Sequence, residues 1–180
     1  MLVVIGPSAS GKTQIVNHLI QDYGFHKLVT YTTRPMRVGE VQDIDYHFIS
    51  QASFEEKYQQ HFFLETVYYN QNYYGTAYSD LSEDKVVIIE KEGLKKYIAH
   101  AREKIVIIFI RCSKPIRRLR MVGRLDEPDC IEKRLQSDDV VFDEELLSLV
   151  DYVIETSNSN VYDCAKLAYT YYQQAIGGSR

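Results

Sequence analysis

The sequence predicts an α/β protein in which helices cover a central parallel sheet. Three observations support this prediction. Short apolar runs recur without the alternation of half-exposed strands, as expected of strands buried on both faces. Segments with helical spacing separate these runs. The chain has 180 residues and a hydrophobic content of 45%, which is enough for one buried core and typical of a single domain.

The predicted elements alternate along most of the chain. The strands are LVVI at 2–5, VVII at 86–89, IVIIFI at 105–110 and YVI at 152–154. The helices are expected at 12–22, 93–101, 115–121, 130–149 and 161–175. Residues 30–80 interrupt the alternation: this region is rich in Tyr and Thr, with strand-like IDYHFIS and FFLET and one short helical segment near 53–60. We therefore expect a small mixed subdomain inserted in the α/β core.

Composition and charge argue against several classes of protein. The net charge of −4 disfavours a nucleic-acid binder, and the basic stretch at 111–124 lacks the interleaved aromatic residues of an RNA site. The three cysteines, Cys112, Cys130 and Cys164, are far apart and indicate neither a disulfide framework nor a zinc site. No apolar run reaches a membrane span, and the N-terminal residues do not resemble a signal sequence. We expect a cytoplasmic protein that binds neither nucleic acid nor membrane.

The segment GPSASGKT satisfies the pattern G-x-x-x-x-G-K-[ST] between a predicted strand and a predicted helix. Backbone amides of such a loop and the positive end of the helix surround an anion, Lys12 adds a mobile charge, and the Thr13 hydroxyl can bind Mg²⁺. A glycine-rich turn that only connects strand to helix is the structural alternative. The residues predicted to bind a nucleoside triphosphate are Gly6, Pro7, Ser8, Ala9, Ser10, Gly11, Lys12 and Thr13. GTPases, motor ATPases and small-molecule kinases share this loop, and the absence of an NKxD motif disfavours a simple GTPase.

A second candidate anion site lies in TYTTRPMRVGEVQDIDYHF. Arg34 and Arg37 would hold a phosphate well beside the Tyr46 hydroxyl, because guanidinium groups bind phosphate oxygens bidentately. Alternatively, the two arginines pair with Glu40 and neighbouring aspartates on an exposed loop.

This stretch resembles the guanylate kinase family, which has a TTR…R.GE…DY.F signature soon after the phosphate loop. The resemblance continues in LETVYYNQNYYGTAYS, which is similar to the family's acidic position followed by N-Y-Y-G-[ST]. It implies a P-loop three-layer core with a nucleoside-monophosphate-binding subdomain and a helical lid. It also implies ATP-dependent phosphorylation of GMP, and of dGMP, to GDP in purine nucleotide metabolism, with Mg²⁺ as cofactor.

The resemblance implies specific roles for residues of this chain. The GMP-binding residues would be Thr30, Arg34, Arg37, Tyr46, Glu65, Tyr74, Thr76 and Glu90. Glu65 suits guanine, because its carboxylate can accept both N1–H and the 2-amino group, an adjacent pair of donors that adenine lacks. Hydroxyls of Thr30 and Thr76 could address the guanine O6 and N7 acceptors.

The segment RCSKPIRRLRMVGRLDEPDCIEKRL is similar to the mobile lid of the family. With Lys12 and Arg34, the implied catalytic residues are Arg120, Arg124 and Arg134, whereas Arg117 and Arg118 are expected to be solvated helix charges. The expected division is a core of 1–29, 81–118 and 141–180, a GMP-binding subdomain of 30–80 and a lid of 119–140, in a monomer or homodimer.

The chain also departs from the family pattern. The third core strand of the family ends in D-x-D before Q-G, and a gapless reading places Ile88 and Glu90 at the two aspartates. Loss of the first carboxylate could lower the rate or shift its role to Glu90 or Glu92. Asp43 stands where the family favours Gly, and the usual adenine-side Asn falls near Thr156. The alternatives are a kinase for another small phosphorylated acceptor and a catalytically weak nucleotide-binding or interaction module.

Overall fold

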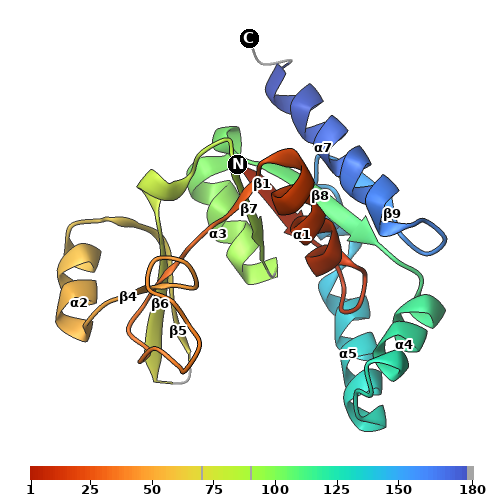
Figure 1. The fold of residues 1–180 in the computed structure, drawn as a ribbon, viewed down its shortest axis with the longest axis horizontal. Helices are drawn as coiled ribbons and strands as arrows, with labels where there is room; N and C mark the ends of the chain where they lie inside the picture. Colours follow the sequence, from red (N-terminus) through yellow and green to blue (C-terminus); the bar gives the residue numbers. More distant parts are fainter. Residues whose placement is uncertain (70, 90, 178–180) are drawn as a thin grey trace.

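A parallel sheet forms the centre of the protein (Figure 1). The computed structural model describes residues 1–69, 71–89 and 91–177. In these residues the central sheet has five strands in the order β2-β7-β1-β8-β9. They are β1 (Leu2–Ile5), β2 (His26–Lys27), β7 (Lys85–Ile88), β8 (Val106–Arg111) and β9 (Tyr152–Glu155), and all pairs are parallel. The predicted α/β class is confirmed.

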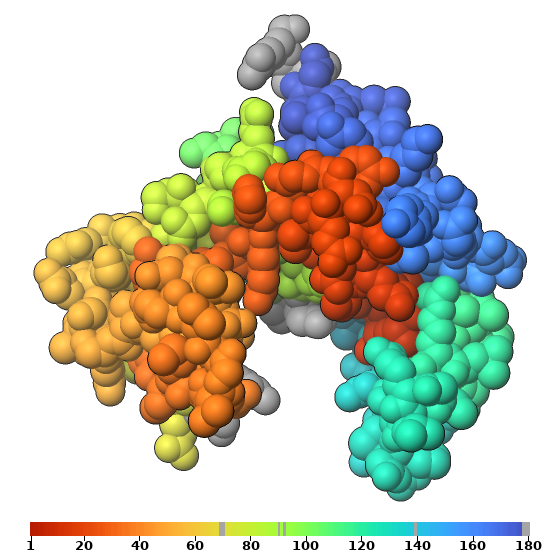
Figure 2. Space-filling view, in the orientation of Figure 1, coloured from red at the N-terminus to blue at the C-terminus, as the bar shows by residue number. Residues whose placement is uncertain are grey.

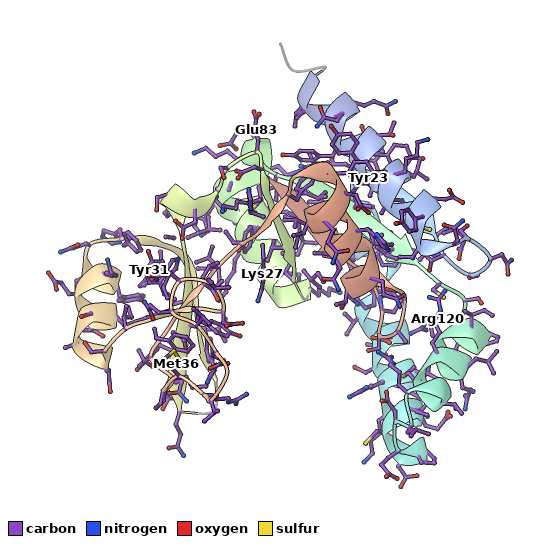
Figure 3. All side chains as sticks on the ribbon, viewed as in Figure 1. Tyr23, Lys27, Tyr31, Met36, Glu83 and Arg120 are labelled. Carbon is purple, nitrogen blue, oxygen red and sulfur yellow. The ribbon has the colours of Figure 1, made fainter. Side chains whose placement is uncertain are left out.

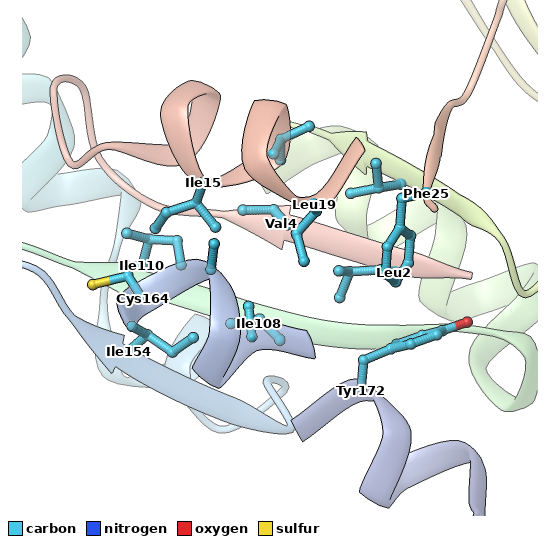
Figure 4. Packing of buried hydrophobic residues seen from close by; sticks show 14 of the residues in the cluster. Leu2, Val4, Ile15, Leu19, Phe25, Ile108, Ile110, Ile154, Cys164 and Tyr172 are labelled. Carbon is cyan, nitrogen blue, oxygen red and sulfur yellow. The ribbon is translucent and has the colours of Figure 1, made fainter. Parts of the chain in front are cut away.

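Helices cover both faces of this sheet. Successive side chains of a strand point to opposite faces, and in the apolar strands both sets must be buried. Leu2 and Val4 belong to a buried cluster that includes residues of α1 (Lys12–Tyr23) and α7 (Val161–Gly177), shown in Figure 4. Val3 and Ile5 belong to a second cluster that includes residues of α3 (Lys91–Ala101) and the short α6 (Glu144–Leu147). The unbroken apolar runs therefore report burial on two sides, which is why they predicted a three-layer core.

Residues 30–80 fold around a second, mixed sheet, as the sequence predicts. Its order is β4-β3-β6-β5, in which β3 and β4 are parallel and the other pairs antiparallel. The elements are β3 (Tyr31–Thr32), β4 (His47–Phe48), α2 (Gln51–Gln59), β5 (Phe63–Tyr69) and β6 (Asn72–Ala77), followed by a short 3₁₀ helix at Tyr78–Asp80. The Ser50 hydroxyl caps α2 by accepting the Ser53 amide.

The structure corrects two predicted elements. Within IDYHFIS only His47 and Phe48 form a strand, because the preceding residues turn around Asp43, whose φ of +64° is left-handed. An aspartate tolerates this conformation, as expected for a position where the family favours Gly. The single helix predicted at 130–149 is two helices, α5 (Pro128–Val141) and α6. Asp143 separates them, because its carboxylate accepts the Leu146 amide at 2.9 Å and so starts a new helix.

Two arms project from the core. One is the mixed subdomain, and the other consists of α4 (Lys114–Gly123) and α5. In the core, a 3₁₀ turn at Arg102–Lys104 precedes β8. Figure 2 shows a deep hollow between the arms. Among the helices of the described residues, none is both long and apolar enough to cross a membrane.

Candidate active site

The phosphate loop connects the carboxyl end of β1, in the middle of the sheet, to α1. Gly6 has φ +149°, and a Cβ there would lie 2.4 Å from the Ile110 carbonyl oxygen, so the loop needs glycine to pass β8. Gly11 has φ +103° at the start of α1. Lys12 Nζ donates to the carbonyls of Gly6 at 2.6 Å and Pro7 at 2.8 Å. The ammonium group thus folds back over the loop, in which the Ser8 amide donates to Asp138 and the Ser10 amide to the Pro7 carbonyl.

Two predicted lid arginines lie next to this loop. A cavity of about 620 Å³ is lined by residues 9–14 together with Arg120, Gly123 and Arg124. Arg120, labelled on α4 in Figure 3, donates to the carbonyls of Ala9 at 3.2 Å and Ser10 at 3.1 Å. It also donates to the Thr156 carbonyl at 2.7 Å. Three cationic side chains, those of Lys12, Arg120 and Arg124, therefore line the same cavity.

The third predicted lid arginine lies apart from the phosphate loop. Arg134 on α5 donates to the Asp126 carboxylate at 2.9 Å, and 54% of its side chain is exposed. Both partners belong to the α4–α5 arm. Arg134 is not among the residues that line the cavity beside the loop.

The expectation that Arg117 is solvated is wrong. Only 4% of the residue is exposed, and its guanidinium donates to Asp138 Oδ2 at 2.7 Å. The same oxygen accepts the backbone amide of Ser8 at 2.9 Å, so Asp138 ties α5 to the phosphate loop. Arg118 is nearly half exposed and pairs with Glu132, as expected for a surface charge.

Asp138 and the Thr156 hydroxyl both contact the phosphate loop, and the sequence predicted neither contact. Thr156 Oγ1 donates to the Ser10 carbonyl at 2.7 Å. Arg117 and Asp138 lie 21 positions apart on different helices, so no local spacing relates them. Thr156 follows β9, and the family resemblance drew attention to it as the position near the usual adenine-side Asn, but did not predict its contact with the loop.

Arg34, Tyr46 and Tyr74 come together in the mixed subdomain. The Arg34 guanidinium lies 5.3 Å from the centre of the Tyr46 ring, and the rings of Tyr46 and Tyr74 are 6.0 Å apart. Arg34 also pairs with Glu40 at 2.7 Å, which is the pairing foreseen as the alternative interpretation. This hydrogen bond is the main cause that raises the pKa of Arg34 and lowers that of Glu40. The Arg37 side chain is exposed, and its backbone amide donates to Glu40 at 2.7 Å.

The residues predicted to read guanine flank the same sheet. Glu65 on β5 faces Thr76 on β6, and Thr76 Oγ1 donates to Glu65 Oε1 at 3.0 Å. Thr30 directly precedes β3, where its carbonyl accepts the His47 amide at 2.9 Å. Glu90 lies outside the described residues. Ile88 at the end of β7 packs against the first core cluster and has no oxygen in its side chain to offer a metal.

Comparison with known proteins identifies the family. The family model described as "Guanylate kinase" matches residues 1–167. The chain belongs to the guanylate kinase family. It is 31% identical over 176 residues to the guanylate kinase of Sulfurimonas denitrificans, covering 92% of this chain and 83% of the relative. It is 34% identical over 174 residues to that of Clostridioides difficile, with the same two coverages of 92% and 83%.

Solved structures support the fold of this guanylate kinase family member. The crystal structure of guanylate kinase from Anaplasma phagocytophilum matches with a TM-score of 0.64 and 24% identity, covering 98% of this chain and 86% of that one. A gluconokinase from Sinorhizobium meliloti matches with a TM-score of 0.56 and 13% identity, covering 99% and 94%. At these identities the likeness concerns the fold alone. Family membership itself confirms the predicted enzyme class, a nucleoside-monophosphate kinase.

Proposed function

We propose that this guanylate kinase transfers the γ-phosphoryl group of ATP directly to the phosphate of GMP or dGMP, in line and without a covalent protein intermediate. The observation that supports this most is the presence of two clusters with cationic side chains on separate parts of the fold. One contains the phosphate loop with Lys12 and Arg120, and the other contains Arg34. Two phosphates held in this way can be brought into line, which is the main task of an enzyme in phosphoryl transfer.

On the donor side, the loop amides and Lys12 hold the ATP phosphates. Lys12 Nζ exchanges its contacts with the Gly6 and Pro7 carbonyls for phosphate oxygens. Arg120 and Arg124 line the same cavity and balance the charge that develops on the transferring group and on the leaving ADP. Such groups act most strongly once water has been excluded.

The donor set around the loop fits Mg²⁺. This ion prefers oxygen ligands and usually takes only one or two from the protein, the others coming from water and substrate phosphates. Thr13, the second residue of α1, provides one exposed hydroxyl. When bound, Mg²⁺ neutralises charge on the donor phosphates. Thr13 would hold it there.

On the acceptor side, Arg34, Arg37, Tyr46 and Tyr74 hold the GMP phosphate, while Glu65 and Thr30 bind guanine. Thr76, expected to contact guanine directly, instead acts through Glu65, because its one proton goes to that carboxylate. The Glu40 carboxylate already keeps the Arg34 guanidinium beside Tyr46. A phosphate therefore meets an arginine whose position is fixed, which limits the entropy lost on binding. Residues 30–80 form the acceptor subdomain, 119–140 form the lid, and the remaining residues form the core. Cytoplasmic localisation stays a prediction.

Guanine preference tests the acceptor assignment. Turnover of GMP, dGMP, AMP, CMP and UMP should favour the two guanine nucleotides, and Glu65→Ala should lower kcat/KM for GMP by roughly 10–100-fold, since it removes hydrogen bonds to a charged acceptor. Glu55→Ala is the matched control, because Glu55 is an exposed carboxylate on α2 of the same subdomain. Coupled ADP-release assays measure both variants. Equal turnover of AMP and GMP by the unaltered enzyme would refute the assignment.

Closure of both arms is the second prediction. GMP with a non-hydrolysable ATP analogue should slow hydrogen exchange in residues 30–80 and 119–140, because the hollow between the arms must close to exclude water. Hydrogen exchange followed by mass spectrometry measures this, and the buried strand β8 is the internal control. Exchange that stays the same in both segments would contradict a mechanism with two moving arms.

A further inference from the structure

We infer that Tyr97, on the core helix α3, is a positioning residue for recognition of the base: its hydroxyl orients Thr76, and through Thr76 it orients the Glu65 carboxylate. This inference rests on the proposed role of Glu65 in binding guanine. The inference assigns a function to Tyr97, which by its burial is a core residue.

Tyr97 is 2% exposed and belongs to the second core cluster, next to Leu94. Its hydroxyl lies 3.1 Å from Thr76 Oγ1, and Thr76 is 1% exposed. Thr76 Oγ1 in turn lies 3.0 Å from Glu65 Oε1. The three side chains belong to α3, β6 and β5, so the line of hydrogen bonds begins in the core and ends at the base-reading strand.

Counting protons fixes the direction of this line. An ionised carboxylate only accepts hydrogen bonds, and a threonine hydroxyl has one proton to donate. The Thr76 proton therefore goes to Glu65, and the Tyr97 hydroxyl must donate to Thr76. Burial is the main cause that raises the pKa of Tyr97, so this hydroxyl keeps its proton at neutral pH.

Helix α3 also brings a lysine near the second oxygen of the Glu65 carboxylate. Lys96 Nζ lies 3.8 Å from Glu65 Oε2 and donates to the Thr66 carbonyl at 2.7 Å. One oxygen of Glu65 is thus held through Thr76 and the other faces a positive charge, which limits rotation of the carboxylate. A carboxylate held in one plane matches an adjacent pair of donors such as guanine N1–H and the 2-amino group better than a single donor.

Tyr97→Phe tests this inference, because it removes the hydroxyl and keeps the buried ring. We expect KM for GMP to rise by about 3–10-fold, the usual effect of losing one hydrogen bond, with KM for ATP unchanged. The preference for GMP over IMP, which lacks the 2-amino group, should fall. In a Thr76→Val background Tyr97→Phe should have no further effect on this preference, because the connection to Glu65 is already broken.

Tyr172→Phe is the matched control. Tyr172 is 1% exposed, its hydroxyl donates to the Glu83 carbonyl at 2.6 Å, and its ring packs in the other core cluster, away from Thr76. It should leave both KM values and the GMP-to-IMP preference as they are. An unchanged preference in Tyr97→Phe, or an equal fall in Tyr172→Phe, would overturn the inference. If Glu65→Ala also left the preference unchanged, the proposed role of Glu65 would fail as well, so the two failures are distinguishable.

Discussion

Replacing Lys12 by alanine is expected to lower kcat by about 10²–10³-fold, the usual effect of removing one preorganised group that stabilises transition-state charge. Lys12 Nζ already lies within 2.6–2.8 Å of two loop carbonyls, so little motion separates it from phosphates held by the same loop. GMP affinity should stay within about twofold, because the two carbonyls that Lys12 contacts, those of Gly6 and Pro7, belong to the donor loop. Steady-state kinetics and calorimetric titration with GMP measure the two effects separately.

The control for this variant is Lys166→Ala, which removes an exposed lysine on α7, outside both arms. It should leave kcat and GMP affinity unchanged. Lys12→Ala with near-normal turnover would show that the loop acts without its ammonium group.

The sequence predicted most of the core because burial on two faces leaves a readable pattern. The runs at 2–5, 86–89, 105–110 and 152–154 all lie within one residue of the observed strands β1, β7, β8 and β9. The edge strand β2 was missed because it has two residues, His26 and Lys27, both exposed. A strand so short and polar has no apolar periodicity to detect.

The sequence could suggest motif residues for the site because the chemistry of phosphate restricts their types, and the family resemblance added residues for guanine. It could not suggest the residues that support them. Arg117 has the sequence context of a surface helix charge, and only the packing of α4 against α5 brings Asp138 beside it. Tyr97 has the spacing of a core residue, and nothing local indicates that its hydroxyl meets Thr76 across 21 positions. Tertiary contacts of this kind have no local spacing to detect.

The Arg117–Asp138 pair leads to the largest predicted effect on stability. The two side chains are 5% and 12% exposed and 2.7 Å apart. Asp138→Ala leaves the Arg117 charge in the interior without this carboxylate, and removing one partner of a buried pair typically costs about 3–5 kcal/mol. Arg118→Ala is the control, because its partner Glu132 and Arg118 are each 46% exposed, and exposed pairs contribute at most about 1 kcal/mol. Urea unfolding measures the free energy of unfolding of each variant.

A double variant separates the two roles of Asp138. Arg117→Leu with Asp138→Ala removes both charges, so most of the lost stability should return, because apolar replacement of a whole buried pair is often neutral. Asp138 Oδ2 accepts the Ser8 amide at 2.9 Å. The double variant lacks this hydrogen bond but should keep a stable fold. If this contact positions the phosphate loop, KM for ATP should change in the double variant while KM for GMP does not. A double variant as unstable as Asp138→Ala would instead show that the loss comes from the Ser8 contact rather than from the buried Arg117 charge.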